Sequence, residues 1–216
     1  MNLKSNMVQR HSIRKFSDKE VDIKILKDII KQAQLAPSWK NTQPWKVYVA
    51  AGDTAKLIRE KHYEYASNNT KGWAEIVPPK DESWAAYPKS NMDKWLKETT
   101  ELVGEDGFKE FWELNKKLFN SSAIIYITVP KNATEYSIYD AGAFGYGILL
   151  SALEHGLGSI PAYELIRYPK IIREHFDISK DESILMGIAL GYPEVDNLNK
   201  IKLSRGNLDL VAKFKN

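Results

Sequence analysis

The segment from Ala123 to Val129, AIIYITV, constrains the fold more than any other part of this 216-residue chain. A near-continuous run of β-branched residues is typical of a strand that is buried on both faces. Apolar periodicity indicates further strands at 45–51 and 184–190, and helices at 21–35, 53–67, 136–155 and 169–175. The pattern predicts an α+β protein in which helices outnumber strands.

The composition excludes several classes of protein. No apolar run approaches the roughly 20 residues that span a bilayer, and residues 1–10 lack the apolar stretch of a signal peptide, so we expect a cytoplasmic protein with no membrane partner. The absence of cysteine excludes disulfides, thiol catalysis and thiolate metal sites. The 31 basic and 28 acidic residues are scattered, which favours a mixed solvated surface over a nucleic-acid-binding stripe.

Two polar segments near the N-terminus carry the strongest functional signal. The first, RHSIRKF at 10–16, brings two guanidinium groups, an imidazole and a hydroxyl into five residues, which suits a phosphate and a second electron-rich group nearby. The second, PSWKNTQPW at 37–45, is a polar loop between a predicted helix and a predicted strand. The first segment alone would favour a solvated basic stretch of chain, and only the combination points to a ligand.

Other catalytic motifs are missing. GAFGYG at 142–147 has the wrong glycine order for a dinucleotide-binding fingerprint and lies inside a predicted helix. Its small residues, with Ser151, lie close to one helical face and predict either a helix crossing or a subunit interface. The four histidines show no metal-ligand spacing, and no G-x-S-x-G elbow is present. Hydrolase and metalloenzyme interpretations therefore lack the residues they need.

Residues 68–120 form an aromatic-rich excursion broken by prolines. Aromatic side chains at 108–119 fall on one helical face, which usually means packing against the body of the protein. So many large rings in an irregular segment also suit a lid over a flat ligand. The two interpretations stay open at about even odds.

The two polar segments, the glycine-rich helix, the GLG at 156–158 with Pro161, and GIALGYP at 187–193 together resemble the FMN-dependent nitroreductase family. The resemblance runs from about Met7 to Arg205. It implies one domain over 1–216, a helix-rich sandwich around a mostly antiparallel sheet, and a domain-swapped homodimer with a C-terminal arm at about 192–216. It also implies FMN as cofactor, bound at two sites between the subunits.

The resemblance assigns roles to individual residues. It implies that Arg10, His11 and Ser12 lie at the flavin phosphate and Arg14 at the N1 side, with Arg205 closing on the phosphate. The partner subunit would contribute Pro37, Ser38, Trp39 and Asn41. Asp140 would lie near the ribityl or dimethylbenzene side, and Asn69 is a candidate for the pyrimidine edge. Pro161, Ala162, Tyr163 and Glu164 would cross one ring face, with the Tyr163 backbone N–H near N5. Some relatives carry a second cation where this chain has Leu203, which predicts a weaker phosphate clamp.

The implied activity is a ping-pong hydride transfer in two half-reactions at one site. NAD(P)H would reduce the flavin, and a nitroaromatic, a quinone or a related flat electrophile would reoxidise it. No side chain is implied as a catalytic acid or base, and no metal is expected. Two alternatives remain: a non-catalytic FMN-binding or storage module, and a reductive dehalogenase or flavin-fragmenting member of the same fold.

Overall fold

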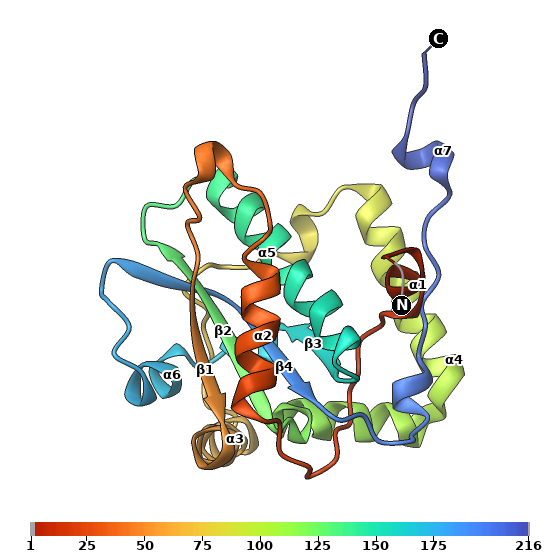
Figure 1. Ribbon diagram of the computed structural model, residues 1–216. Helices are drawn as coiled ribbons and strands as arrows, with labels where there is room; N and C mark the ends of the chain where they lie inside the picture. The colour runs from red at the N-terminus through yellow and green to blue at the C-terminus, as the bar shows by residue number, and fades with distance from the viewer. Residues whose placement is uncertain (1–2, 216) are drawn as a thin grey trace.

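The computed structural model describes residues 3–215 and has a four-stranded antiparallel sheet at its centre, in the order β1-β2-β4-β3 (Figure 1). The strands are β1 (Lys46–Ala51), β2 (Ala123–Pro130), β3 (Gly158–Ala162) and β4 (Glu182–Gly191). In β2 every residue from Ala123 to Val129 is buried, as the sequence predicts. The predicted α+β sandwich with an antiparallel sheet is confirmed.

Helices cover both faces of the sheet (Figure 1). On one face α2 (Ile23–Ala33) packs against α5 (Glu135–Glu154), and on the other lie α3 (Gly52–Ser67), α4 (Ala86–Lys116) and α6 (Pro169–His175). Alternate residues of β2 serve the two cores: Ile125 belongs to the α2–α5 side, and Tyr126 to the other. The predicted helix crossing is present, because a Cβ on Gly147 would lie 3.1 Å from the Ala33 Cα.

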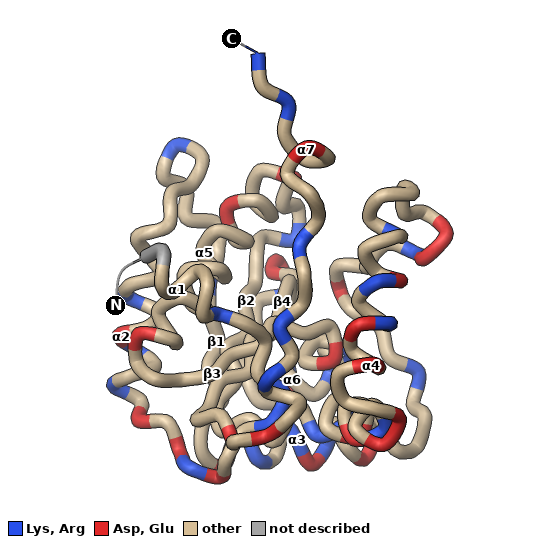
Figure 2. The backbone as a smooth tube through the Cα atoms, turned by 90° about the vertical axis from the view of Figure 1, so that its right-hand side faces the viewer, with Lys and Arg blue, Asp and Glu red and all other residues tan. Residues whose placement is uncertain are grey.

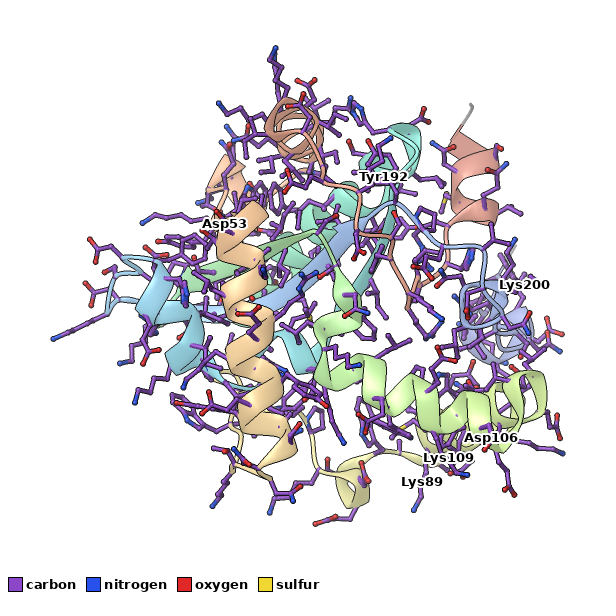
Figure 3. All side chains as sticks on the ribbon, turned by 90° about the horizontal axis from the view of Figure 1, so that it is seen from below. Asp53, Lys89, Asp106, Lys109, Tyr192 and Lys200 are labelled. Atoms are coloured by element: carbon purple, nitrogen blue, oxygen red, sulfur yellow. The ribbon has the colours of Figure 1, made fainter. Side chains whose placement is uncertain are left out.

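The excursion at 68–120 is more regular than its prolines suggest, because α4 spans 31 residues. Pro88 lies in its first turn, where a missing N–H costs nothing. Gly104 bends the helix with φ 70° and ψ 176°, so its two halves run in different directions (Figure 1). Figure 3 shows Asp106 and Lys109 on the second half, pointing away from the body.

The remaining elements are short. They are α1 (Leu3–Gln9), α7 (Leu208–Val211), and the 3₁₀ turns η1 (Trp39–Asn41), η2 (Asp81–Ser83), η3 (Leu118–Asn120), η4 (Tyr163–Ile166) and η5 (Leu198–Lys200). Neither α1 nor β3 is indicated by the sequence pattern.

The C-terminal segment leaves the body after η5, passes along α4 and points outward (Figures 1 and 2). Its apolar side chains Leu208, Leu210, Val211 and Phe214 are each at least 60% exposed. The arm at 192–216 and the single domain over 1–216 stay predictions. Residues 1, 2 and 216 lie outside the described part of the chain. Within residues 3–215 no helix is long and apolar enough to cross a membrane.

Candidate flavin site

The basic segment Arg10–Arg14 lies along the edge of the sheet, beside β3. Ser12 forms a parallel bridge with Ser159, and the Ile13 N–H donates to the Ser159 carbonyl at 3.1 Å. This close approach depends on Gly158, since a Cβ there would lie 2.6 Å from Ile13 Cγ1. The structure therefore brings the basic segment next to the strand that contains Pro161 and Ala162 and leads into η4.

Asn199 of η5 holds the basic segment in place, and its side chain is almost completely buried. Its Oδ1 accepts from the backbone N–H groups of Arg14 (2.7 Å) and Lys15 (3.1 Å), and its Nδ2 donates to the carbonyls of Lys15 (2.7 Å) and Glu194 (3.0 Å). Sequence reasoning missed this residue. No sequence signal identifies it, because Arg14 and Lys15 are 184–185 positions away along the chain.

Arg14 is a buried cation with incomplete hydrogen bonding. It is 6% exposed, its Nη1 donates to the Ser12 carbonyl at 3.0 Å, and its guanidinium lies 5.6 Å from the centroid of the Phe111 ring. Its Nε is buried without a hydrogen-bond partner in the described part of the chain. Burial lowers the pKa of Arg14 to about 10, so the side chain still carries its charge at neutral pH.

The residues at the end of β3 and in η4 differ in which way they face. Tyr163 is 40% exposed and Pro161 is exposed, so both are available to a ligand. The Glu164 carboxylate instead faces inward, 3.0 Å from Arg167 Nη1 and 3.4 Å from His62 Nε2. Burial lowers the pKa of His62, whose Nδ1 lies 2.8 Å from the Lys116 carbonyl. The side chain of Glu164 thus anchors η4, which leaves its backbone as the part that can line a flat ligand.

Asn69 is exposed and adopts φ +52° just after α3. The next residues run beside the end of η4: the Thr70 carbonyl accepts from the Tyr168 hydroxyl at 3.1 Å, and the Trp73 N–H donates to the Arg167 carbonyl at 2.9 Å. Asn69 is therefore placed near the same element as Tyr163. Its contact with a flavin stays a prediction.

Arg205 lies on the C-terminal arm, at a cavity of about 450 Å³ between the arm and the first half of α4. The cavity is lined by Tyr87, Lys94, Trp95 and Glu98 as well as Arg205. Ser204 ties the arm to the helix, because its Oγ donates to Glu98 at 2.7 Å. Arg205 Nη1 donates to the carbonyls of Leu203 and Ser204, at 3.0 and 3.1 Å. Lys and Arg residues recur along this arm (Figure 2).

The loop Pro37–Asn41 lies at the other end of α5 from α1 and the start of the basic segment (Figure 1). The Trp39 N–H donates to Asp140 Oδ2 at 2.9 Å, near the start of α5. Asn6 of α1 instead contacts Glu154, the last residue of α5. At 1.5 Å per residue these two contacts are about 21 Å apart along the helix. Asp140 therefore lies beside the loop, and within one chain the loop does not reach the basic segment.

The loop borders an apolar cavity of about 610 Å³. The lining comes from the loop and the first turns of α5: Pro37, Ser38, Trp39, Glu135, Tyr136, Tyr139 and Asp140. The rings of Trp39 and Tyr136 are 5.2 Å apart, and Tyr139 is 78% exposed. This end of the molecule offers mainly aromatic surface, with the carboxylates of Glu135 and Asp140 in the lining.

The aromatic excursion divides between packing and exposure. Phe111 is buried in the core on the α3 side, and Trp95 packs against that core. Phe108 contacts Phe111 and Trp112, whereas Trp112 and Trp73 are about half exposed. The packing interpretation holds for Phe111 and Trp95, and a lid role for the exposed rings stays a prediction. Within the described residues no group of three or more His, Asp or Glu side chains could hold a metal ion.

Comparison with known proteins identifies the family. The model of the Nitroreductase family matches residues 7–192. The chain belongs to this family. It is 24% identical over 205 residues to a 4-nitrobenzoate reductase of Pseudomonas putida, covering 92% of this chain and 89% of that protein.

Solved structures share the fold of this chain. The FMN-dependent nitroreductase NfnB from Mycobacterium smegmatis in complex with NADPH superimposes with a TM-score of 0.89 at 20% identity, over all of both chains. An iodotyrosine deiodinase bound to FMN and 3-iodo-L-tyrosine gives a TM-score of 0.67 at 19% identity, again over all of both chains.

Proposed function

We propose that this nitroreductase-family protein is an FMN-dependent oxidoreductase that uses NAD(P)H to reduce nitroaromatics, quinones or related flat electrophiles. The observation that carries the proposal is Arg14, a charged side chain buried beside β3 with an unpartnered Nε. A buried donor without a partner costs about 1–3 kcal/mol, so its retention indicates a ligand that supplies the acceptor. The relative named as a nitrobenzoate reductase and the NADPH complex of NfnB support the same conclusion.

The residues present fit FMN. A flavin offers carbonyl and ring-nitrogen acceptors at one end and a phosphate at the other, and this chain has Arg14 at the β3 edge, Arg10 on the same basic segment and Arg205 on the C-terminal arm. When bound, FMN supplies the hydride chemistry. Arg14 would orient the pyrimidine side and oppose negative charge there, because its pKa of about 10 keeps it cationic at pH 7.

We propose that the function requires two copies of the chain. The loop Pro37–Asn41 and the basic segment are separated along α5, so the loop can serve only the site of a partner. The exposed face of α5 fits such a partner, because Tyr139, Gly142 and Tyr146 are exposed along it and the C-terminal arm also exposes apolar side chains. We propose a homodimer with exchanged arms and one FMN per chain.

Gly142→Ala tests the dimer. Within one chain a Cβ at Gly142 would meet nothing within 4 Å, so the substitution should stabilise an isolated helix by about 1 kcal/mol. If a partner helix packs closely on this face, the added methyl should instead weaken the dimer and lower the unfolding midpoint. Analytical ultracentrifugation and urea unfolding measure both effects, with Gly145→Ala as the sheet-facing control. A flavin-loaded wild-type monomer, or a more stable Gly142→Ala protein, would contradict the dimer.

The activity is tested with the purified protein. Heating should release FMN from a yellow protein, and steady-state assays should show NADH or NADPH oxidation that depends on an added nitroaromatic or quinone. Bound FMN without NAD(P)H oxidation would overturn the oxidoreductase and favour a storage module. Turnover of 3-iodotyrosine, without turnover of the nitroaromatic or the quinone, would favour the dehalogenase alternative. The fold likeness to an iodotyrosine deiodinase is the reason to test it.

A further inference from the structure

A cavity of about 410 Å³ lies where the start of β4, the turn after β2 and α6 meet. Its lining includes Trp73, Glu75, Lys131, Arg173, Lys180 and Ser183. On β4, Ser183 lies four residues before Gly187, the partner of Ala162, which is about 14 Å along the strand. Figure 1 shows α6 and the start of β4 on the opposite side of the molecule from α1. The cavity is therefore separate from the residues assigned to the flavin.

Backbone hydrogen bonds fix two walls of this cavity. The Trp73 N–H donates to the Arg167 carbonyl at 2.9 Å, and the Lys131 N–H donates to the Asp181 carbonyl at 2.7 Å. The side chain of Trp73 is nevertheless 57% exposed. An indole that is held at its backbone but not buried offers a stacking surface to a flat ligand, and the fixed walls reduce the cost of ordering the site.

The carboxylates of the cavity are already paired. Glu75 accepts from Arg173 Nε at 2.6 Å and from its Nη2 at 3.0 Å. Glu182 accepts from Lys46 at 2.6 Å and from two hydroxyl groups. Burial opposes the ionisation of both carboxyls, but these hydrogen bonds outweigh it and lower the pKa of each. Both groups are therefore charged and neutralised by a cation at neutral pH.

Two cations of the cavity are not paired. Lys131 and Lys180 are exposed, and within residues 3–215 their side chains form no ion pair or hydrogen bond. The charge of Lys131 also favours the ionised form of Glu75, but that carboxylate is held by the two hydrogen bonds from the arginine. Asp181, the neighbour of Lys180 in sequence, lines a different cavity. The lining thus keeps two uncommitted ammonium groups beside an exposed indole.

We propose that this cavity binds a small phosphate monoester that carries a flat ring, with the ring on Trp73 and the phosphate held by Lys131 and Lys180. A phosphate monoester has close to two negative charges at pH 7 and so matches two ammonium groups better than a carboxylate does. Lysine binds phosphate well as a point charge. The volume lies in the range of about 300–1,000 Å³ that is usual for small-molecule sites. This site goes beyond the proposed flavin chemistry and does not depend on it.

The first measurement is nitrogen NMR of the purified protein, with the flavin it retains and with ¹⁵N-labelled tryptophan, which gives six indole signals. Trp73→Leu assigns the Trp73 signal by its disappearance. AMP should shift this signal in a saturable way, and adenosine and inorganic phosphate should each bind about tenfold more weakly, because each lacks one of the two groups. AMP that binds elsewhere leaves the signal in place.

Three results would overturn the proposal. A Trp73 signal that AMP does not shift would remove the site. Adenosine that binds as tightly as AMP would remove the phosphate, and benzoate that binds more tightly than AMP would replace it with a carboxylate. A purified protein without flavin would count against the proposed function alone, because the readout here is at Trp73.

Lys131→Gln and Lys180→Gln separate the charge from the shape of the cavity. At low salt each should weaken AMP about two- to fivefold, the scale of one exposed charge pair, and leave adenosine unchanged. Lys27→Gln is the control, since this exposed lysine lies on α2, on the other face of the sheet, and its loss should leave AMP binding unchanged. Wild-type AMP affinity in both cavity variants, or equal losses of AMP and adenosine, would show that these lysines do not hold a phosphate.

Discussion

Replacing Arg14 with methionine should leave the flavin-free protein at least as stable as the wild type while reducing its affinity for flavin about 10- to 100-fold. A cation whose pKa falls on folding destabilises the folded state wherever it is charged, and burial lowers the pKa of Arg14 to about 10. Methionine fills a similar volume and removes the unpartnered buried Nε. A hydrogen bond from a charged donor to the flavin is worth about 1.5–3 kcal/mol. Its loss corresponds to the expected 10- to 100-fold decrease in affinity, at about 1.4 kcal/mol per tenfold.

Both FMN and riboflavin should weaken equally in Arg14→Met, since Arg14 is assigned to the pyrimidine side and not to the phosphate. Flavin fluorescence quenching gives the two affinities, and urea unfolding of the flavin-free protein gives the stability. Arg59→Met is the matched control: Arg59 is a half-buried arginine on α3 that donates to the Ser121 carbonyl at 2.6 Å, and its loss should cost stability without changing flavin affinity. If Arg14→Met unfolds easily but binds flavin normally, Arg14 is a structural residue.

Much of the fold could be predicted because its signals are local. The run at 123–129 became β2, and the small-residue-rich helix expected at 136–155 became α5 at 135–154. The strand β3 could not be predicted, because its five residues include Gly158 and Pro161, which usually indicate a turn. Pro161 is tolerated there because β3 is an edge strand, a property that depends on the finished sheet.

The site shows the same division between local and distant signals. The basic segment is visible in the sequence because its charged residues are neighbours. Asn199 and His62 are not, because their contacts with Arg14 and Glu164 join residues about 100 or more positions apart. The inward direction of the Glu164 side chain also depends on α3, which packs beside η4 only in the folded chain. Sequence resemblance assigned Glu164 to a ring face, and the structure leaves only its backbone for that role.

Gly158→Ala should lower both the stability of the protein and its affinity for FMN, because this glycine lets the basic segment approach β3. An added Cβ would lie 2.6 Å from Ile13 Cγ1 and 2.9 Å from Ile13 Cβ, closer than side chains tolerate. The Cβ of Ile13 is attached to the backbone, so the segment itself must shift. We expect a loss of about 1–3 kcal/mol in the free energy of unfolding, which is the usual cost of overpacking a core.

A double-mutant cycle shows whether the clash with Ile13 is the cause. Ile13→Ala removes the two Cγ atoms that the new methyl would meet but keeps the Cβ at 2.9 Å, so Gly158→Ala should cost less, though still something, in that background, and the two effects should not add. Gly145→Ala is the control: its methyl would make ordinary contacts of 3.4 Å and 3.9 Å with Ile127 and Ile188, and alanine favours the helix. Additive losses from Gly158→Ala and Ile13→Ala would contradict the explanation. Weakened FMN binding in Gly158→Ala, partly relieved in the double variant, would show that the position of the basic segment on β3 controls the cofactor site.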